Sequence, residues 1–281
     1  MKVYVDSRHR ISGTNEDFVW QIPETVDIPD SWCYIDCVLV PNTFFSIRQN
    51  YNNKVYLKER VGTTDHYIVL NIQPGQYNGV TLATALQTAM NAVTQMGASN
   101  YTVVYDVDTA KIKITSSAAT GNQFTIFGEI ALNGGLWNAS GNSSPVDLNN
   151  TQSANKVFGF NEGQLIGTAH ATDAVPTARI PLIGDSVIDV QRHHCLYVHS
   201  DLGEPGSSWG CRGESSVIRR VVVDALQNGL AIDRHTTSWD AVEVGSKALR
   251  SMSFRLADDN GTTVDLQGHH WSFSLVFHDK L

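Results

Sequence analysis

Charge is scarce in this chain, and long apolar runs are missing. Only 17% of the 281 residues are Asp, Glu, Lys or Arg, whereas soluble domains average roughly 25%. We therefore expect a surface rich in Ser, Thr, Asn, Gln and Gly. No apolar run approaches the ~20 residues that a membrane-spanning helix needs, so we expect no membrane span.

Positive charge is the scarcer sign. The chain carries 20 Lys and Arg against 28 Asp and Glu, a formal net charge of −8. Its densest basic groups, Arg8-His9-Arg10 and Arg219-Arg220, are too short to follow a phosphate backbone. We therefore expect no nucleic-acid partner.

Cysteine is also rare, with only four residues: Cys33, Cys37, Cys195 and Cys211. Cys33 and Cys37 lie four residues apart on an expected strand, about 13 Å from each other. A disulfide needs Cα atoms within ~7 Å, so these two cannot bridge each other. Because no C-x-x-C spacing occurs, buried thiols are favoured over a zinc site built from Cys195, Cys211 and nearby histidines.

Sequence motifs of catalysis are missing too. The chain has no Gly-rich phosphate loop, no G-x-S-x-G elbow and no H-E-x-x-H zinc motif. Adjacent histidines such as His269 and His270 point to opposite faces of a strand and would not bind one metal together. The segment Asp258–Gly261 is explained more simply by a turn than by a calcium site. We therefore expect no enzyme activity, no catalytic residue, no metal site and no cofactor.

Alternating apolar and polar residues dominate what is present. Trp271, Phe273, Leu275 and Phe277 alternate with more polar neighbours, and Met252–Leu256 shows the same period of two. The Asn-Gly turn between these runs predicts a hairpin. Further strands are expected at Lys2–Asp6, Phe18–Ile22, Trp32–Val40, Lys54–Glu59, Tyr67–Ile72, Val187–Val190, Leu196–Ser200, Val217–Asp224 and Ala241–Val244.

The middle of the chain has a different pattern. Apolar residues recur at helical spacing between Val80 and Val93. A hairpin at Tyr101–Thr115 and a strand at Phe124–Phe127 follow, so helix and strands together predict a small α+β unit. The flanking strands are too few on either side for a closed β-sandwich. We therefore expect an all-β sandwich core formed discontinuously by residues 1–72 and 168–281, with residues 73–167 as an inserted α+β domain.

Several segments, taken in order along nearly the whole chain, carry a family resemblance. They are Tyr4–Arg10, Gly13-Thr14, Phe18–Pro23, Val40–Ile47, Ile72–Tyr77, Tyr101–Asp106, Lys111–Thr115, Val157–Phe160, Leu256–Gly261, Val264–Leu266, Gly268 and Trp271–Leu275. In this order they resemble the penton proteins, the minor capsid proteins at the vertices, of virophages, polinton-like viruses and adintovirus-like elements.

The resemblance implies a jelly-roll β-sandwich with an inserted small α+β domain. It further implies a homopentamer at the icosahedral vertices of the virion, in contact with the major capsid protein of the same virus. It transfers no active site. Because Met1–Asp6 contains no apolar stretch of a secretory signal, we expect synthesis in the host cytoplasm.

One basic segment is our candidate for a subunit or capsid contact. Arg8, His9 and Arg10 stand close together on an otherwise acidic chain. We expect the segment Asp6–Thr14 to leave the sandwich and to contact acidic neighbours, since the planar guanidinium pairs carboxylates bidentately. A solvated charged turn is the alternative.

Two other classes of protein stay open. A carbohydrate- or receptor-binding β-sandwich module of a viral fibre or lectin would be favoured by an exposed aromatic residue such as Trp137. Binding of a host receptor or glycan through the inserted domain could also accompany a capsid role. A jelly-roll enzyme of the cupin type is disfavoured because its metal triad is missing.

Overall fold

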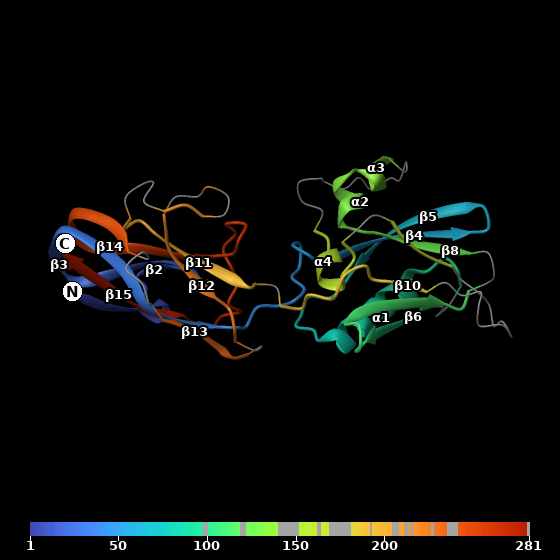
Figure 1. Cartoon of the computed structure of the whole chain (residues 1–281), viewed down its shortest axis with the longest axis horizontal. Helices are drawn as coiled ribbons and strands as arrows, with labels where there is room; N and C mark the ends of the chain where they lie inside the picture. Colours follow the sequence, from blue (N-terminus) through green and yellow to red (C-terminus); the bar gives the residue numbers. More distant parts are fainter. Residues whose placement is uncertain are drawn as a thin grey trace. The chain divides into compact units, whose positions relative to one another are not determined.

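The computed structural model describes twelve segments of the chain, and their strands and helices gather in two compact units (Figure 1). Met1–Phe44 and His193–Leu281 form the first unit, and Phe45–Arg192 form the second. Among the described residues, no helix is long and apolar enough to cross a membrane. The described residues are 1–97, 101–118, 122–139, 152–161, 164–168, 181–191, 193–203, 208–210, 213, 216–225, 228–234 and 241–279.

The first unit is an antiparallel sheet with the strand order β1-β15-β3-β14-β11-β12, and β2 and β13 also pair with β3. A short 3₁₀ helix, η1 (Ser7–His9), follows β1. The strands are β1 (Lys2–Asp6), β2 (Ser12–Gly13), β3 (Asp17–Pro41), β11 (Cys195–Ser200), β12 (Val217–Val222), β13 (Leu230–Arg234), β14 (Val242–Ala257) and β15 (Ser272–Asp279).

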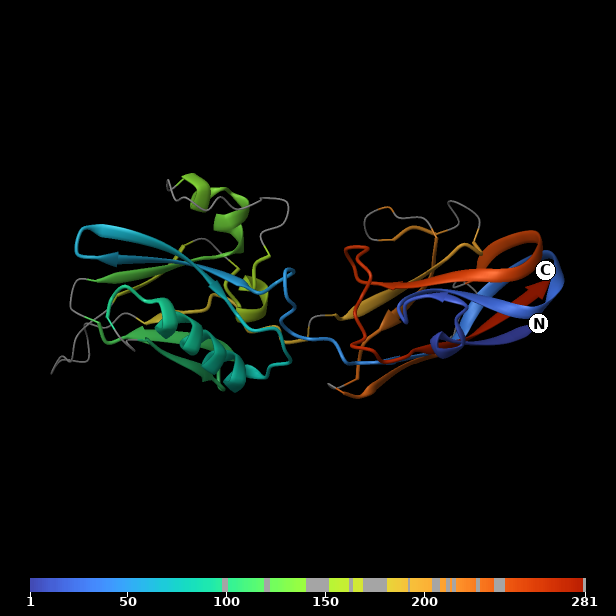
Figure 2. The same cartoon turned by 180° about the vertical axis from the view of Figure 1, so that it is seen from behind.

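This sheet curls until its two halves face each other. β3 and β14 pair along their length, from Asp17–Arg255 to Cys33–Val242, with register shifts on the way, and Figure 2 shows the two strands bending together. Phe254 of β14 meets Phe273 of β15 at 4.8 Å between ring centroids, although β3 separates these strands in the sheet. The expected all-β, jelly-roll-like fold class is confirmed.

The last two strands do not form the expected hairpin. β14 pairs with β3 and β11, whereas β15 pairs with β1 and β3. The segment Asp258–Gly261 is still a turn, in which the Asp258 carboxylate accepts the Asn260 and Thr262 N–H groups at 2.9 Å each. The chain crosses between the two layers after this turn, and the alternating pattern alone contains no information about which strands become neighbours.

A β-bulge changes one expected face of β3. Ser274 pairs with Cys37 and Leu275 with Ile35, so Asp36 is an extra residue on β3. The sequence predicts that Cys33, Ile35, Cys37 and Leu39 share one face, but the bulge turns Cys37 and Leu39 outward while Cys33 and Ile35 stay buried.

The second unit contains two small sheets and one long helix. The sheets have the orders β5-β4-β8-β9 and β10-β7-β6. Helix α1 (Gly79–Val93) begins at a reciprocal cap between Asn78 and Thr81, and it buries Leu82, Leu86 and Met90 in the unit's apolar core. The other elements are β4 (Lys54–Val61), β5 (Thr64–Asn71), β6 (Tyr101–Asp106), β7 (Lys111–Ser116), β8 (Gln123–Phe127), α2 (Glu129–Asn133), α3 (Leu136–Ala139), α4 (Asn155–Phe158), β9 (Gln164–Thr168) and β10 (Leu182–Ile183).

The boundaries of the two compact units differ from those expected from the sequence. The sequence analysis assigns residues 1–72 and 168–281 to the sandwich and residues 73–167 to the inserted domain, whereas the first unit comprises residues 1–44 and 193–281. β4 and β5, which the sequence assigns to the sandwich, lie in the second unit because β4 pairs with β8 between Leu57–Ile126 and Arg60–Gln123. Residues 181–191 also lie there, since β10 pairs with β7. Alternation identifies β4 and β5 correctly but not their partners, whereas it misses β10, and the strand expected at Val187–Val190 is not formed.

Candidate functional site

The basic segment that the sequence singles out lies between β1 and β2 and is packed against the last strand. Asp6 caps η1 by accepting the Arg8 N–H at 2.9 Å. The buried Ser7 exchanges two hydrogen bonds with Trp271, from Ser7 N–H to Trp271 O at 3.1 Å and from Trp271 N–H to Ser7 Oγ at 3.2 Å. These contacts hold the segment at the end of the sandwich.

Arg8 forms an ion pair within its own segment. Its Nη2 lies 2.6 Å from Asp6 Oδ2, and its Nε lies 3.0 Å from the same oxygen. This hydrogen-bonded guanidinium holds the pKa of the Asp6 carboxyl below its usual value. The Arg8 side chain is 63% exposed, so solvent screens its pair with Asp6 and the pair contributes little to stability.

Arg10 holds the turn that leads into β2. Its Nη1 donates to Ser7 O at 2.9 Å and its Nε donates to Gly13 O at 3.2 Å. Gly13 has a φ of +92°, and a Cβ placed on it would lie 2.2 Å from Asp17 O. Glycine is therefore required here. Both arginines thus bind groups of this chain, whereas His9 is exposed.

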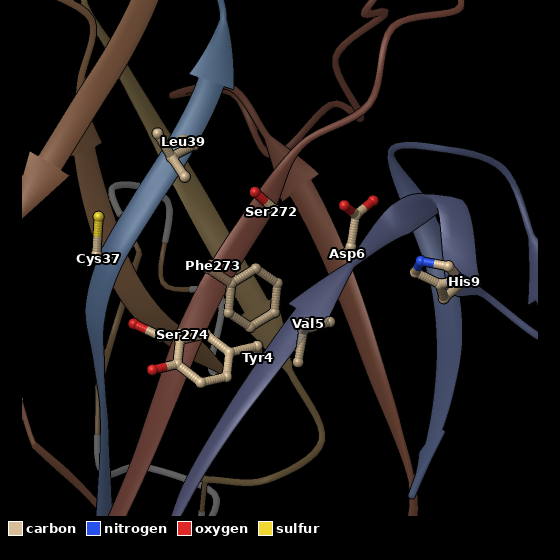
Figure 3. A pocket seen from close by; sticks show the side chains of 9 residues that line it. All are labelled: Tyr4, Val5, Asp6, His9, Cys37, Leu39, Ser272, Phe273 and Ser274. Atoms are coloured by element: carbon tan, nitrogen blue, oxygen red, sulfur yellow. The ribbon is translucent and has the colours of Figure 1, made fainter.

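His9 borders a hollow of about 390 Å³ on the outer face of the sheet. The Asp36 bulge creates this face by turning Cys37 and Leu39 outward beside β1 and β15. Tyr4, which is 74% exposed, lies over β15 opposite Ser274 (Figure 3). The lining residues are Tyr4, Val5, Asp6, His9, Cys37, Leu39, Ser272, Phe273 and Ser274. Of these, the sequence analysis includes only Asp6 and His9 in its candidate contact; Cys37 and Leu39 were missed because the bulge leaves no signal in the alternation.

Several of the segments that carry the family resemblance, all in the first unit, meet near this site although they are far apart in sequence. Trp271 Nε1 donates to Asn15 O at 2.8 Å, and the Leu266 N–H donates to Glu16 Oε1 at 3.0 Å. Thr43 Oγ1 in turn donates to Leu266 O at 2.8 Å. Segments from the beginning, the end and the Val40–Ile47 run therefore build one substructure.

Two histidines near Cys195, which the sequence offers as possible metal ligands, take part in packing and hydrogen bonding instead. His193 meets the Phe44 ring edge-on at 4.9 Å, and His199 Nδ1 lies 3.3 Å from Ser216 Oγ; both histidines are buried. In the part of the chain that the structure describes, no three His, Cys, Asp or Glu side chains lie close enough to hold a metal ion. Cys211 lies outside the described residues.

Comparison with known proteins gives structural neighbours but no match by sequence. No protein-family model and no curated protein matches this chain. Among solved structures, the chain is similar to the selenomethionine-labelled penton protein of mavirus, with 8% sequence identity and a TM-score of 0.49 over 100% of both chains.

Proposed function

We propose that this chain is a structural penton protein that forms homopentamers at the icosahedral vertices of a virus capsid. Its partners are four further copies of itself and the major capsid protein of the same virus. The chain acts in the virion as a building block and not as an enzyme, after synthesis in the host cytoplasm. The viruses that the resemblance indicates are virophages, polinton-like viruses and adintovirus-like elements.

The observation that carries the proposal is that resembling segments from the beginning and the end of the chain meet in one substructure of the first unit. Trp271, which is 1% exposed, bonds to both Ser7 and Asn15, and so ties the last strand to the N-terminal turn. These segments keep their order over nearly the whole chain. Their shared role is to build a jelly-roll end, which favours a structural protein over a catalytic one.

Trp137, the residue that would favour the lectin-type alternative if it were exposed, is buried. Trp137 is 1% exposed and packs edge-on against Tyr56, Tyr67 and Phe127 at 5.1 to 5.3 Å between ring centroids. It therefore presents no face to a sugar. The sequence could not reveal this burial, because two of its aromatic partners, Tyr56 and Tyr67, lie on β4 and β5, far from Trp137 along the chain.

Receptor binding through the second unit stays part of the proposal. Val104, Lys113 and Ile183 lie opposite one another on three neighbouring strands, and Val104 and Ile183 are 51% and 49% exposed. Such an exposed apolar pair fits a protein or glycan contact. Binding of the purified chain to host cells, and its loss in the variant Val104→Lys, would test this part.

The oligomeric state tests the proposed function directly. Native mass spectrometry and light scattering of the purified full chain should give five times the chain mass of 30.9 kDa. Electron microscopy of native particles should place this chain at the five-fold vertices. A chain that stays monomeric at micromolar concentration, or that lies elsewhere in the particle, would refute the proposal.

A further inference from the structure

β1 lies at one end of the strand order in the first unit, and among the described strands only β15 pairs with it, so its outer edge is open there. The Ser7 N–H donates to Trp271 O at 3.1 Å. The N–H and C=O groups of the odd-numbered residues of this segment therefore point towards β15. Hydrogen bonding alternates along an antiparallel ladder. The peptide groups of Lys2, Tyr4 and Asp6 therefore point away from β15.

β12 is the last strand at the other end of the same order, and no described strand pairs with its outer edge. The Val223 N–H donates to His194 O at 2.9 Å, so the peptide groups of Arg220, Val222 and Asp224 point away from β11 by the same alternation. All three side chains are exposed on the outer face, and Val222 is 46% exposed.

We propose that β1 of one copy pairs antiparallel with β12 of a second copy, so that the sheet continues from subunit to subunit. The pairing joins outward-pointing peptide groups on both strands, and it matches charge with opposite charge and apolar with apolar. The three facing pairs are Asp6 with Arg220, Tyr4 with Val222, and Lys2 with Asp224.

Neighbouring registers lose this match. A slip of two residues in one direction places Tyr4 opposite Arg220 and Asp6 opposite the buried Ile218. The opposite slip places Tyr4 opposite Asp224. A slip of one residue turns the peptide groups and the side chains of one strand the wrong way. Opposite charges that face each other across strands are stabilising, so the charges select a single register.

The candidate site contributes to this contact through Arg8. Arg8 fixes the Asp6 carboxylate at the edge of β1 by its bidentate hydrogen bonds. Within the described residues, no ion pair engages Arg220 or Asp224. Both are therefore available to a second copy, where Arg220 would join Arg8 at Asp6.

A contact between two different edges is heterologous, and such contacts generate closed rings or open filaments. Five copies joined β1 to β12 fit the proposed vertex pentamer. The inference rests on the proposed function for the number of copies, whereas the strand pairing follows from the edges themselves.

Disulfide trapping tests the register. The facing residues Tyr4 and Val222 are both changed to Cys in the full chain, since facing Cα atoms in a hydrogen-bonded pair lie ~5.5 Å apart, within disulfide reach. The control pairs Tyr4→Cys with Arg220→Cys, two residues out of register. Because Cys195 lies directly opposite Val222, serine first replaces the cysteines that could compete: Cys37, Cys195 and Cys211.

Charge reversal tests the pairing energy without a change in net charge. The double variant Arg220→Asp with Asp224→Lys places like charges opposite Asp6 and Lys2. We expect the dissociation constant between copies to rise about tenfold or more, with an unchanged melting temperature. The matched control reverses Lys156 and Asp108, two exposed residues of the second unit.

Intermolecular cross-linking of the 4/222 pair but not of the 4/220 pair, together with weaker association of the charge-reversed variant, is the expected result. Oligomers that assemble with no 4/222 cross-link, or with an unaltered dissociation constant after charge reversal, would overturn the strand pairing and leave the proposed pentamer standing. Cross-linked oligomers with a copy number other than five would support the pairing and refute the pentamer. A chain that stays monomeric would overturn both.

Discussion

Asn91 of α1 takes the place of a missing strand beside β6. β6 is the last strand in the order β10-β7-β6. The Asn91 side chain donates from Nδ2 to Tyr101 O at 2.9 Å and accepts the Tyr101 N–H at 2.8 Å. Gln87, one turn earlier, accepts the Val103 N–H at 2.9 Å. Two amide side chains thus satisfy the edge of this sheet.

The variant Asn91→Ala removes both hydrogen bonds to Tyr101, which is 2% exposed. Each net hydrogen bond contributes roughly 0.5–1.5 kcal/mol, and buried groups left unpaired cost about 1–3 kcal/mol. Ala forms helix better than Asn by roughly half a kcal/mol, which offsets part of the loss. We expect the free energy of opening around β6 to fall by about 2 kcal/mol.

Hydrogen exchange of the full chain measures this locally, without any need for the two units to unfold together. A loss of about 2 kcal/mol corresponds to roughly thirty-fold faster exchange of the β6 amides. Exchange in β15 of the first unit should stay unchanged. Thr88→Ala on the exposed side of α1 is the control, because its hydroxyl bonds only to Thr84 O. If Asn91→Ala exchanges no faster than this control, the amide clamp does not stabilise β6.

Three further predictions concern the first unit. Arg219→Ala should destabilise it by about 3 kcal/mol in urea unfolding, because the inward-pointing Arg219 pairs with Asp233 through two bonds of 2.9 Å and its loss leaves a partly buried carboxylate alone; a smaller loss than in an exposed Lys→Ala variant would contradict this. Gly13→Ala should cost at least about 1 kcal/mol by the same assay, since φ is +92° and the new Cβ would meet backbone; equal stability would show that the turn rearranges freely. In Arg8→Ala, the pKa of Asp6 followed by NMR should rise towards its ordinary value, because the arginine hydrogen bond lowers it. The pair therefore stabilises the fold above the unfolded-state pKa, and this contribution is lost as pH falls through the lower folded-state pKa; an unshifted Asp6 in the variant would refute the cause.

Local pattern was enough to predict the fold class and most strands. The alternation of Trp271–Phe277 predicts β15, and the helical spacing of Val80–Val93 predicts α1, whose bounds are Gly79–Val93. Both signals are short-range and follow from which side chains are buried. Which strands pair with each other depends on contacts between residues far apart in sequence. The pairing of β4 with β8 joins residues more than sixty positions apart, and no local pattern encodes it.

The candidate site was predictable only in part, for a related reason. The basic residues Arg8, His9 and Arg10 are visible as composition, but Asp6 as the partner of Arg8 depends on the cap of η1. The outward turn of Cys37 and Leu39 depends on one extra residue, Asp36, opposite β15. A bulge is set by the pairing of two strands and leaves the composition of each one unchanged.

The treatment of sheet edges connects these structural details to assembly. An exposed edge is a template for pairing with another chain, and proteins that stay monomeric cover or blunt it. Asn91 and Gln87 cover β6 in the second unit in this way. In the first unit, β1 and β12 are the ends of the order of described strands. The outward side chains of each edge run from a positive through an apolar to a negative residue, so two antiparallel edges complement each other. In the proposed assembly, the edges of β1 and β12 pair between copies, whereas amide side chains cover the edge of β6 within one copy. This contrast connects the strand register to the proposed role at a capsid vertex.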